Sequence, residues 1–412
     1  MNEFLRLVPP SVALRHFLEH ITDDMRLATE TIPTEGALGR VLAQDVLAES
    51  PLPSFRRSTV DGFAVRASDT FGASPSLPAY LDLAGEVPMG GVAETPVGPR
   101  QAEIVHTGGM IPEGADAVVM VEDTQTPRPG EVEVMKPAAV GQNVLQVGED
   151  VQPGEAVLST GARLRPQEIG GLMALGVIEV VVSRRPRVGI LSTGDEVIPP
   201  AETPAPGQVR DVNSFTLGGL VERAGGIPRS YGILPDQRAR LLEAARHAHA
   251  QSDFVIIAAG SSVSTRDMTA DVIQELGAPG VLVHGIAIKP GKPTILARAG
   301  RVPVIGLPGN PISALVVAGL FVPPALARLQ GVAGPELTPY LTARLTTNMA
   351  SEAGREDYVA VRLIASPDGW LAEPVFGRSN LIFTLVRAHG LVRIAPEATG
   401  VGAGEPVQVR LM

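Results

Sequence analysis

Two of the three lysines in the chain, Lys289 and Lys292, lie three positions apart in the segment IKPGKP, and Lys136 is the third. Arginine fills every other basic position among the 34 Lys and Arg residues. A lysine ammonium is a compact charge that can approach an oxyanion from several directions, and a following proline restricts the backbone that carries it. The pair predicts contact with phosphate or a small oxyanion; a solvated turn is the alternative.

Three loops of small residues follow three apolar segments that are typical of buried strands. STGDE (192–196) follows RVGIL, GSSVSTRD (260–267) follows DFVIIAA, and LPGNPIS (307–313) follows PVIG. Ligands of parallel sheets bind where the carboxyl ends of strands meet helix N-termini. One such loop could be an ordinary turn, but three at one edge predict an anion site. The lysine segment faces this edge if residues 294–304 form a hairpin.

The same loops carry carboxylates, namely Asp195, Glu196 and Asp267, and Asp236 follows another predicted strand. Carboxylates beside phosphate-binding loops are consistent with Mg²⁺, because the cation offsets the repulsion between acidic side chains and phosphate oxygens. The alternative is that Asp236 and Asp267 cap helices and that Glu196 is a solvated loop acid.

Two further sequence patterns are weaker evidence for a binding site. The segment from Gly285 to Lys292 resembles a phosphate-binding P-loop, but its glycine spacing is one residue too long and Pro293 replaces the Ser or Thr. His16 and His20 in HFLEH match a zinc motif, but no third ligand is marked, so we expect surface histidines.

The elements that must position these residues follow from hydrophobic periodicity. We expect helices at 11–28 (with Ser11 as N-cap), near 34–43, from Pro166 onward, and at about 213–225, 237–249, 267–276 and 311–329. Alternation of these helices with apolar strands predicts a doubly wound parallel α/β sheet over about 185–330. Short β-like runs from about residue 50 to 140 predict a separate β-rich module, and alternating patterns in the last 80 or so residues predict a small β-barrel.

Composition limits the class of protein. A chain of 412 residues predicts two to four domains, and a net charge of −10 argues against a nucleic-acid or acidic-membrane surface. The absence of cysteine excludes disulfides and thiolate metal sites. Without a signal peptide or any evident stretch of about 18 uncharged apolar residues, we expect a cytoplasmic protein.

Six segments together resemble the molybdopterin molybdenumtransferase family, which comprises the MoeA proteins and the E-domain of gephyrin. They are PSFRRSTVDGFAVR (53–66), TGGMIPEGADAVV (107–119), VGED (147–150), STGDE (192–196), IKPGKP (288–293) and GLPGNPIS (306–313). The resemblance covers nearly the whole chain.

The resemblance implies four domains and a homodimer whose active cleft includes the partner subunit. The domains are a helical and extended domain I (1–50 and 141–184), the inserted β-rich domain II (51–140), the α/β molybdopterin-binding domain III (185–330) and the C-terminal β-barrel domain IV (331–412). It also implies transient contact with a molybdopterin adenylyltransferase and with chaperones of molybdenum enzymes.

The resemblance further implies a Mg²⁺-dependent reaction in which adenylylated molybdopterin and molybdate give molybdenum cofactor and AMP. Lys289 and Lys292 would meet molybdate or phosphate oxygens; Glu196, Asp236 and Asp267 would hold Mg²⁺ and act on the pyrophosphate-like bond. The expected substrate contacts are Asp61, Gly62, Thr107, Asp150, Ser192, Thr193, Gly194, Asp195, Asn213, Gly260, Ser261, Ser262, Arg266, Pro308, Gly309, Asn310, Pro311, Ser313, Arg355 and Ser379.

This sequence departs from the family pattern in three places, which are the 259–267 loop with Arg266, the missing arginines before Gly148, and Phe383 with Thr384 in place of a serine pair. Two other functions remain open from sequence. One is adenylyl transfer to molybdopterin; the other is a non-catalytic scaffold of the gephyrin kind. Molybdate and tungstate both remain open as the metal substrate.

Overall fold

The computed structural model describes residues 7–259, 263–334 and 338–412, and the side chains of residues 263–267 lie outside that description. Its central unit is a six-stranded sheet with two layers of helices. The strands, in spatial order, are β16 (Ile227–Leu234), β13 (Arg187–Thr193), β17 (Phe254–Ala259), β21 (Val302–Pro308), β20 (Ile295–Ala299) and β18 (Pro279–His284).

The first four of these strands are parallel, as the sequence predicts, whereas β20 and β18 run antiparallel to their neighbours. The change of direction arises because β20 and β21 form a tight hairpin, in which Gly300 adopts a positive φ of 57°. The predicted hairpin between the lysines and the third loop is therefore confirmed.

Alternate residues of the sheet face two helical layers. Val188, Ile190 and Phe254 pack against one layer, and Leu191 and Val255 pack against the other. The first layer is α1 (Pro10–Glu19), α3 (Asn213–Arg223) and α6 (Pro311–Gln330); the second is α4 (Arg238–Gln251) and α5 (Val263–Leu276). The doubly wound α/β prediction is confirmed.

Helix α6 contradicts the expectation that no long uncharged apolar stretch occurs. Among the described residues it is the one helix long and apolar enough to cross a membrane, judged by length and composition alone. However, 67% of that apolar window is buried inside the fold, where Phe321 and Leu326 pack in the core. We assign α6 as a core helix, since such helices are hydrophobic on all sides.

The C-terminal region is a closed five-stranded barrel, as expected. Its strands follow one another around the barrel as β24 (Glu356–Ser366), β25 (Gly369–Pro374), β22 (Tyr340–Leu345), β28 (Pro406–Leu411) and β26 (Gly390–Ile394), and β26 closes onto β24. A short helix, α7 (Phe383–Val386), lies between β25 and β26, and β23 (Met349–Ala350) pairs with β27 (Gly400–Val401).

The chain crosses from the α/β unit to the inserted module through short paired strands. These are β1 (Thr29–Pro33) with β12 (Glu179–Ser183), β2 (Val46–Leu47) with β11 (Ala156–Leu158), and β3 (Arg57–Ser58) with β10 (Val144–Leu145); α2 (Pro166–Ala174) packs beside them. The module is a second six-stranded sheet in the order β7 (Ala117–Met120), β4 (Gly62–Val65), β6 (Gln101–Val105), β5 (Ala79–Glu86), β9 (Glu131–Val134) and β8 (Thr124–Arg128).

Two helix predictions near the N-terminus are wrong. The helix expected over 11–28 ends at Glu19, and Pro9 precedes it in place of a Ser11 cap, with no side-chain cap hydrogen bond. The helix expected over 34–43 is only a 3-10 turn, Thr34–Gly36, because Gly39 adopts a left-handed φ of 76° that ends any helical path.

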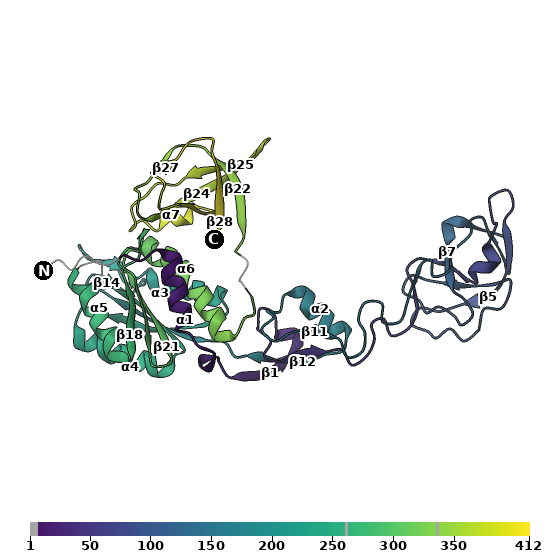
Figure 1. Ribbon diagram of the computed structural model, residues 1–412, viewed down its shortest axis with the longest axis horizontal. Helices are drawn as coiled ribbons and strands as arrows, with labels where there is room; N and C mark the ends of the chain where they lie inside the picture. Colours follow the sequence, from purple (N-terminus) through teal and green to yellow (C-terminus); the bar gives the residue numbers. More distant parts are fainter. Residues whose placement is uncertain (1–6, 260–262, 335–337) are drawn as a thin grey trace.

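The whole molecule is elongated (Figure 1). The α/β unit and the barrel lie side by side at one end, the inserted module lies at the other, and the region of α2, β1 and β12 joins them. The module therefore stands away from the loops of the α/β sheet in the same chain.

Candidate functional site

Strand register places the lysine segment at the same sheet edge as the loop after β21. His284 pairs with Ile295, and Ile295 pairs with Gly306, so residues 285–294 leave and re-enter the sheet where β21 ends. The loops after β13, β16 and β17 open at this edge too, because these strands run parallel to β21. The predicted gathering of loops at one edge is confirmed.

The lysine segment belongs to two parts of the molecule at once. It connects β18 to β20 in the α/β sheet, yet its residues Ile288–Lys289 form β19, which pairs in parallel with β24 of the barrel. The N–H of Glu356 donates to the carbonyl of Ala287 at 2.9 Å. This ladder holds the lysines at the junction between the α/β unit and the barrel.

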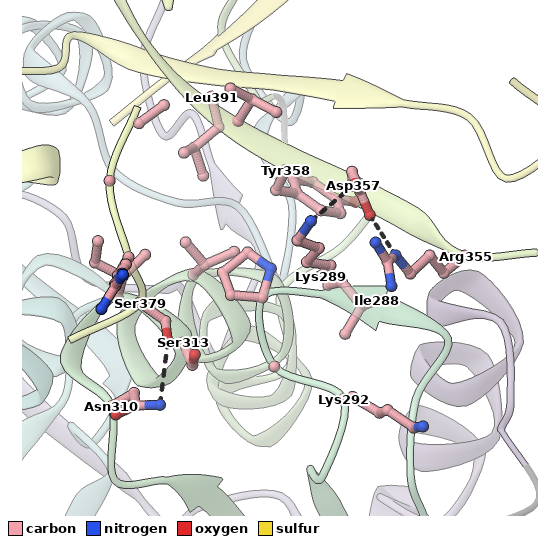
Figure 2. A pocket seen from close by; sticks show the side chains of 18 of the residues that line it. Ile288, Lys289, Lys292, Asn310, Ser313, Arg355, Asp357, Tyr358, Ser379 and Leu391 are labelled. Carbon is pink, nitrogen blue, oxygen red and sulfur yellow. Dashed lines mark hydrogen bonds and ion pairs between the residues drawn. The ribbon is translucent and has the colours of Figure 1, made fainter. Parts of the chain in front are cut away.

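The two lysines point in different directions (Figure 2). The Lys289 ammonium faces the buried carboxylate of Asp357, its cross-strand partner, with Nζ and Oδ2 3.9 Å apart. Lys292 extends away from that pair. Gly291 turns the chain between them at φ 115°, and the hydroxyl of Thr294 donates to the Gly291 carbonyl at 2.7 Å.

A cavity of about 990 Å³ opens between the α/β unit and the barrel, and both lysines line it. This size fits a ligand as large as a nucleotide or a pterin. Besides apolar side chains, its lining includes Lys289, Lys292, Asn310, Ser313, Glu352, Arg355, Asp357, Arg378 and Ser379.

The beginning of α6 meets the barrel at this cavity. The Asn310 amide donates to the hydroxyl of Ser379 at 3.1 Å, and the N–H of Ile312 donates to the Ser379 carbonyl at 3.1 Å. On the other side of the loop, the Asn213 amide donates to the Gly309 carbonyl at 2.8 Å. The predicted residues Asn213, Gly309, Asn310 and Ser379 therefore lie together, with Pro308 and Pro311 flanking them in the same loop.

Arg355, which the sequence predicts as a substrate contact, lines the cavity, and two carboxylates hold it. Its Nε donates to Asp357 Oδ1 at 2.9 Å, and its Nη1 lies 2.9 Å from Glu352 Oε2. Asp357 thus contacts both Arg355 and Lys289. One carboxylate that serves two cations keeps this side of the cavity from carrying their full positive charge.

The two acidic loops that follow β13 and β16 lie together at the opposite end of the sheet edge from the lysine segment. The Asp195 carboxylate accepts a hydrogen bond from the N–H of Asp236 at 3.1 Å, which joins the loops after β13 and β16. Three strand spacings separate β13 from β20, about 14 Å at the usual distance between strands. The lysines and the acids therefore occupy two ends of one edge and do not form one compact cluster.

The first residues of the β13 loop are packed. Ser192 donates to the buried carboxylate of Asp211 at 3.4 Å, and Thr193 is buried. Gly194 adopts φ 150°, and a side chain there would lie 2.8 Å from the Glu196 carboxylate. The close approach explains the glycine and shows that the Glu196 side chain folds back over the loop.

Five of the predicted site residues are not fully described by the structure. Gly260, Ser261 and Ser262 are not described, and neither are the side chains of Arg266 and Asp267. Within the described ranges, no group of three or more His, Asp or Glu side chains is placed to hold a metal ion. The expected Mg²⁺ set includes Asp267, so only Glu196 and Asp236 of that set are described. Their oxygens, with Asp195 beside them, are the hard donors that Mg²⁺ takes.

Asp61 and Thr107 form a hydrogen-bonded pair in the inserted module. The Thr107 N–H and hydroxyl donate to Asp61 Oδ1 at 2.8 and 3.2 Å, and both bonds hold the pKa of Asp61 below its usual range. Gly62 allows β4 to approach β7, since a side chain there would lie 2.0 Å from the Val119 carbonyl. Asp150 is exposed where the chain returns from the inserted module, and its N–H donates to the Leu52 carbonyl at 3.0 Å.

Sequence reasoning missed three residues that the structure brings to the site, Asp211, Asp357 and Arg378. Asp211 joins the end of β13 to α3, because it accepts from both Ser192 and the N–H of Ser214. The position of Asp211 two residues before a predicted helix was an available capping signal. Nothing in the local sequence marks Asp357, because its partner Lys289 lies 68 positions earlier in the chain.

His16 of α1 and His20, the residue just after this helix, lie edge to face with ring centroids 4.6 Å apart, and a nitrogen of the His20 ring lies 2.8 Å from the His16 carbonyl oxygen.

Comparison with known proteins gives matches along almost the whole chain. Residues 10–176 match the MoeA N-terminal region (domain I and II), residues 189–328 match a probable molybdopterin binding domain, and residues 342–412 match the MoeA C-terminal region (domain IV).

Among curated proteins, the molybdopterin molybdenumtransferase of Haemophilus influenzae is 35% identical over 383 residues, which cover 92% of this chain and 93% of that protein. The protein of the same name from Bacillus subtilis is 33% identical over 388 residues, with 93% and 90% covered. The crystal structure of the molybdopterin biosynthesis MoeA protein from Pyrococcus horikoshii OT3 is similar with a TM-score of 0.83 and 34% identity, covering 99% of this chain and 100% of that one.

Proposed function

This chain belongs to the MoeA family, and from that premise we propose that it is a molybdopterin molybdenumtransferase of molybdenum cofactor biosynthesis. The proposed substrates are adenylylated molybdopterin and molybdate, and the products are molybdenum cofactor and AMP. The phosphoanhydride between the pterin phosphate and AMP is hydrolysed: water supplies the oxygen of the new phosphate bond, and molybdate gives up oxygen as water when molybdenum binds the pterin.

The observation that carries this proposal is the cationic cavity between the α/β unit and the barrel. Lys289, Lys292 and Arg355 line a space large enough for a pterin, and the hydroxyls of Ser313 and Ser379 lie at the start of α6. Ammonium and guanidinium groups with hydroxyl donors suit a doubly charged tetrahedral oxyanion. We assign the cavity to molybdate and the pterin end of the substrate.

We assign the acidic end of the sheet edge to the nucleotide side of the same substrate. Glu196 and Asp236, with Asp267 as the third acid, would hold Mg²⁺, and Asp195 would keep the two loops in place through its bond to the Asp236 N–H. When bound, Mg²⁺ would offset the negative charge of the phosphoanhydride oxygens. The distance of about 14 Å along the edge matches an extended substrate better than a small one.

We propose that the remaining predicted contacts come from a second subunit. Asp61 and Thr107 lie in the inserted module, which stands away from the cavity in the same chain (Figure 1). We therefore include in the proposal a homodimer in which the module of one subunit faces the cavity of the other. Transient contacts with a molybdopterin adenylyltransferase, which would deliver the substrate, and with chaperones of molybdenum enzymes belong to the same proposal.

The test is release of AMP by the purified full chain from adenylylated molybdopterin. We expect release that requires both molybdate and Mg²⁺, and we expect Lys292→Ala to slow it by about a hundredfold, as for loss of a group that stabilises developing negative charge. Lys136→Ala is the matched control, because Lys136 is exposed in the inserted module and pairs with Asp123. Absence of AMP release by the wild type would contradict the proposal, and consumption of ATP instead would favour adenylyl transfer.

A further inference from the structure

The stem of the inserted module carries two adjacent arginines, Arg56 and Arg57, which the fold uses differently. Arg56 donates to the carbonyls of Ala115 and Pro112 at 2.9 and 3.1 Å, so it ties the stem to the module. Arg57 is half-buried and forms no ion pair within the described ranges, and its buried Nε has no hydrogen-bond partner there. An unsatisfied buried donor is destabilising, so no polar contact among the described residues accounts for a charge at this position.

The ring of Phe55 holds the Arg57 guanidinium. Its centroid lies 4.6 Å from Arg57 Cζ, the distance of a cation–π contact. Such a contact covers one face of the planar group and leaves N–H groups at its edge able to donate. The guanidinium is thus oriented before any ligand binds, which lowers the entropy that binding must overcome.

Arg57 occupies the middle of three adjacent chain segments. It pairs with Leu145 of β10 on one side and forms an antiparallel bridge to Met110 on the other. Residues directly opposite one another project from the same face of a sheet. Leu145 is one of the residues before Gly148 where the sequence lacks the arginines of the family pattern. Arg57 therefore returns a guanidinium to that face from the neighbouring strand.

Strand β3 also holds the loop that contains Thr107, because the N–H of Ser58 donates to the Gly109 carbonyl at 2.9 Å. Thr107 donates two hydrogen bonds to the Asp61 carboxylate, which lower the pKa of Asp61 and keep it negatively charged. An anionic substrate that meets this carboxylate is repelled unless a cation accompanies it. Arg57 supplies a cation on the strand that holds the loop.

We propose that Arg57 binds a phosphate group of the substrate, reaching from the inserted module of one subunit into the cleft of the other. The inference rests on the proposed function, since it takes both the anionic substrate and the homodimer from there. A guanidinium edge donates two parallel hydrogen bonds to phosphate oxygens, which an ammonium cannot do. Arg57 thereby adds a cation to the wall on which Asp61 and Thr107 are the expected contacts.

The test is steady-state AMP release by the purified full chain at varied concentrations of adenylylated molybdopterin. We expect Arg57→Ala to raise KM about tenfold with little change in kcat, as for a charged hydrogen bond that substrate and transition state share. Arg57→Lys keeps the charge and the side-chain stem but not the planar fork, so its KM should lie between the two. Arg128→Ala is the matched control and should leave KM unchanged, because Arg128 is exposed in β8, at the far edge of the module sheet.

A guanidinium moved to the opposite strand gives an independent check. Leu145→Arg combined with Arg57→Ala should restore most of the lost affinity, since residue 145 lies directly opposite on the same face. An unchanged KM in Arg57→Ala, an equal increase in Arg128→Ala, or no recovery with Leu145→Arg would overturn the role of Arg57 and leave the proposed function standing. Absence of AMP release by the wild type would instead overturn the proposed function.

Discussion

At the scale of single residues, Gly291 decides how the two lysines are presented. Its φ of 115° is strained for any other residue, and a side chain there would lie 2.2 Å from a methyl group of Val317 in α6. We predict that Gly291→Ala destabilises the fold by about 2 kcal/mol or more, because both the backbone and the packing must shift. Thermal unfolding measures this, with Gly170→Ala as the control, since Gly170 lies in α2 with open space around it.

The Asp195 carboxylate holds the loop that contains Asp236 through a hydrogen bond to the Asp236 N–H. Removing the carboxylate in Asp195→Ala frees the Asp236 N–H and loosens the acidic end of the edge. We expect the Mg²⁺ concentration for half-maximal AMP release to rise by about fivefold, the usual effect of losing one hydrogen bond, and Asp195→Asn to retain most of the affinity. Equal effects of the two substitutions would show that the charge, and not the hydrogen bond, matters.

At the scale of elements, strand β24 carries a buried acid that supports the barrel wall behind the cavity. Glu356 accepts two hydrogen bonds from Arg393 of β26, both at 2.8 Å, and one from the Tyr358 hydroxyl at 3.0 Å. Burial opposes ionisation, but these bonds and the charge of Arg393 outweigh it and lower the pKa of Glu356. Burial and the neighbouring Glu356 raise the pKa of Tyr358.

The stability that Glu356 contributes depends on pH. Because the folded pKa of Glu356 lies below the ordinary value of 4.5, its stabilisation is present above that pH and is lost as the pH falls through the folded pKa. We predict that thermal stability falls less steeply on acidification in Glu356→Gln than in the wild type. Glu373→Gln, which removes an exposed pair with Arg362, should leave the profile unchanged.

The hydrophobic pattern of the strands predicted which loops lie at the sheet edge, because an apolar strand and the small residues that follow it are both visible in a short stretch of sequence. Residues 192–196, 285–294 and 307–313 therefore open at one edge of the sheet, as the sequence predicts. The pairing of β19 with β24 could not be predicted, since two residues of strand carry no periodicity and their partner lies 68 positions away. For the same reason Asp357 was missed as the partner of Lys289.

The expected helix over 34–43 failed for a different physical reason. Its residues include Gly36 and Gly39, and Gly39 takes a left-handed conformation that a hydrophobic pattern cannot reveal. The separation of the acids from the lysines also depends on strand order. The order β16-β13-β17-β21-β20-β18 places them at opposite ends, and order is a tertiary property.

At the scale of the whole molecule, the elongated shape favours our proposal that two subunits build the site (Figure 1). We predict that mixing the inactive variants Asp61→Asn and Lys292→Ala, followed by subunit exchange, restores about one quarter of wild-type AMP release, because half of the dimers would be mixed and each of these has one intact cleft. Molecular mass by light scattering should give a dimer. No recovery on mixing, despite demonstrated exchange, would show that Asp61 acts within its own chain or not at all.

A crystal structure of the full chain with molybdate, recorded with anomalous scattering from molybdenum, tests the proposed site most directly. We predict a molybdenum peak inside the cavity between the α/β unit and the barrel, within reach of Lys289, Lys292 and Ser313. A peak at any other place, or an empty cavity at a molybdate concentration that saturates binding in solution, would contradict it.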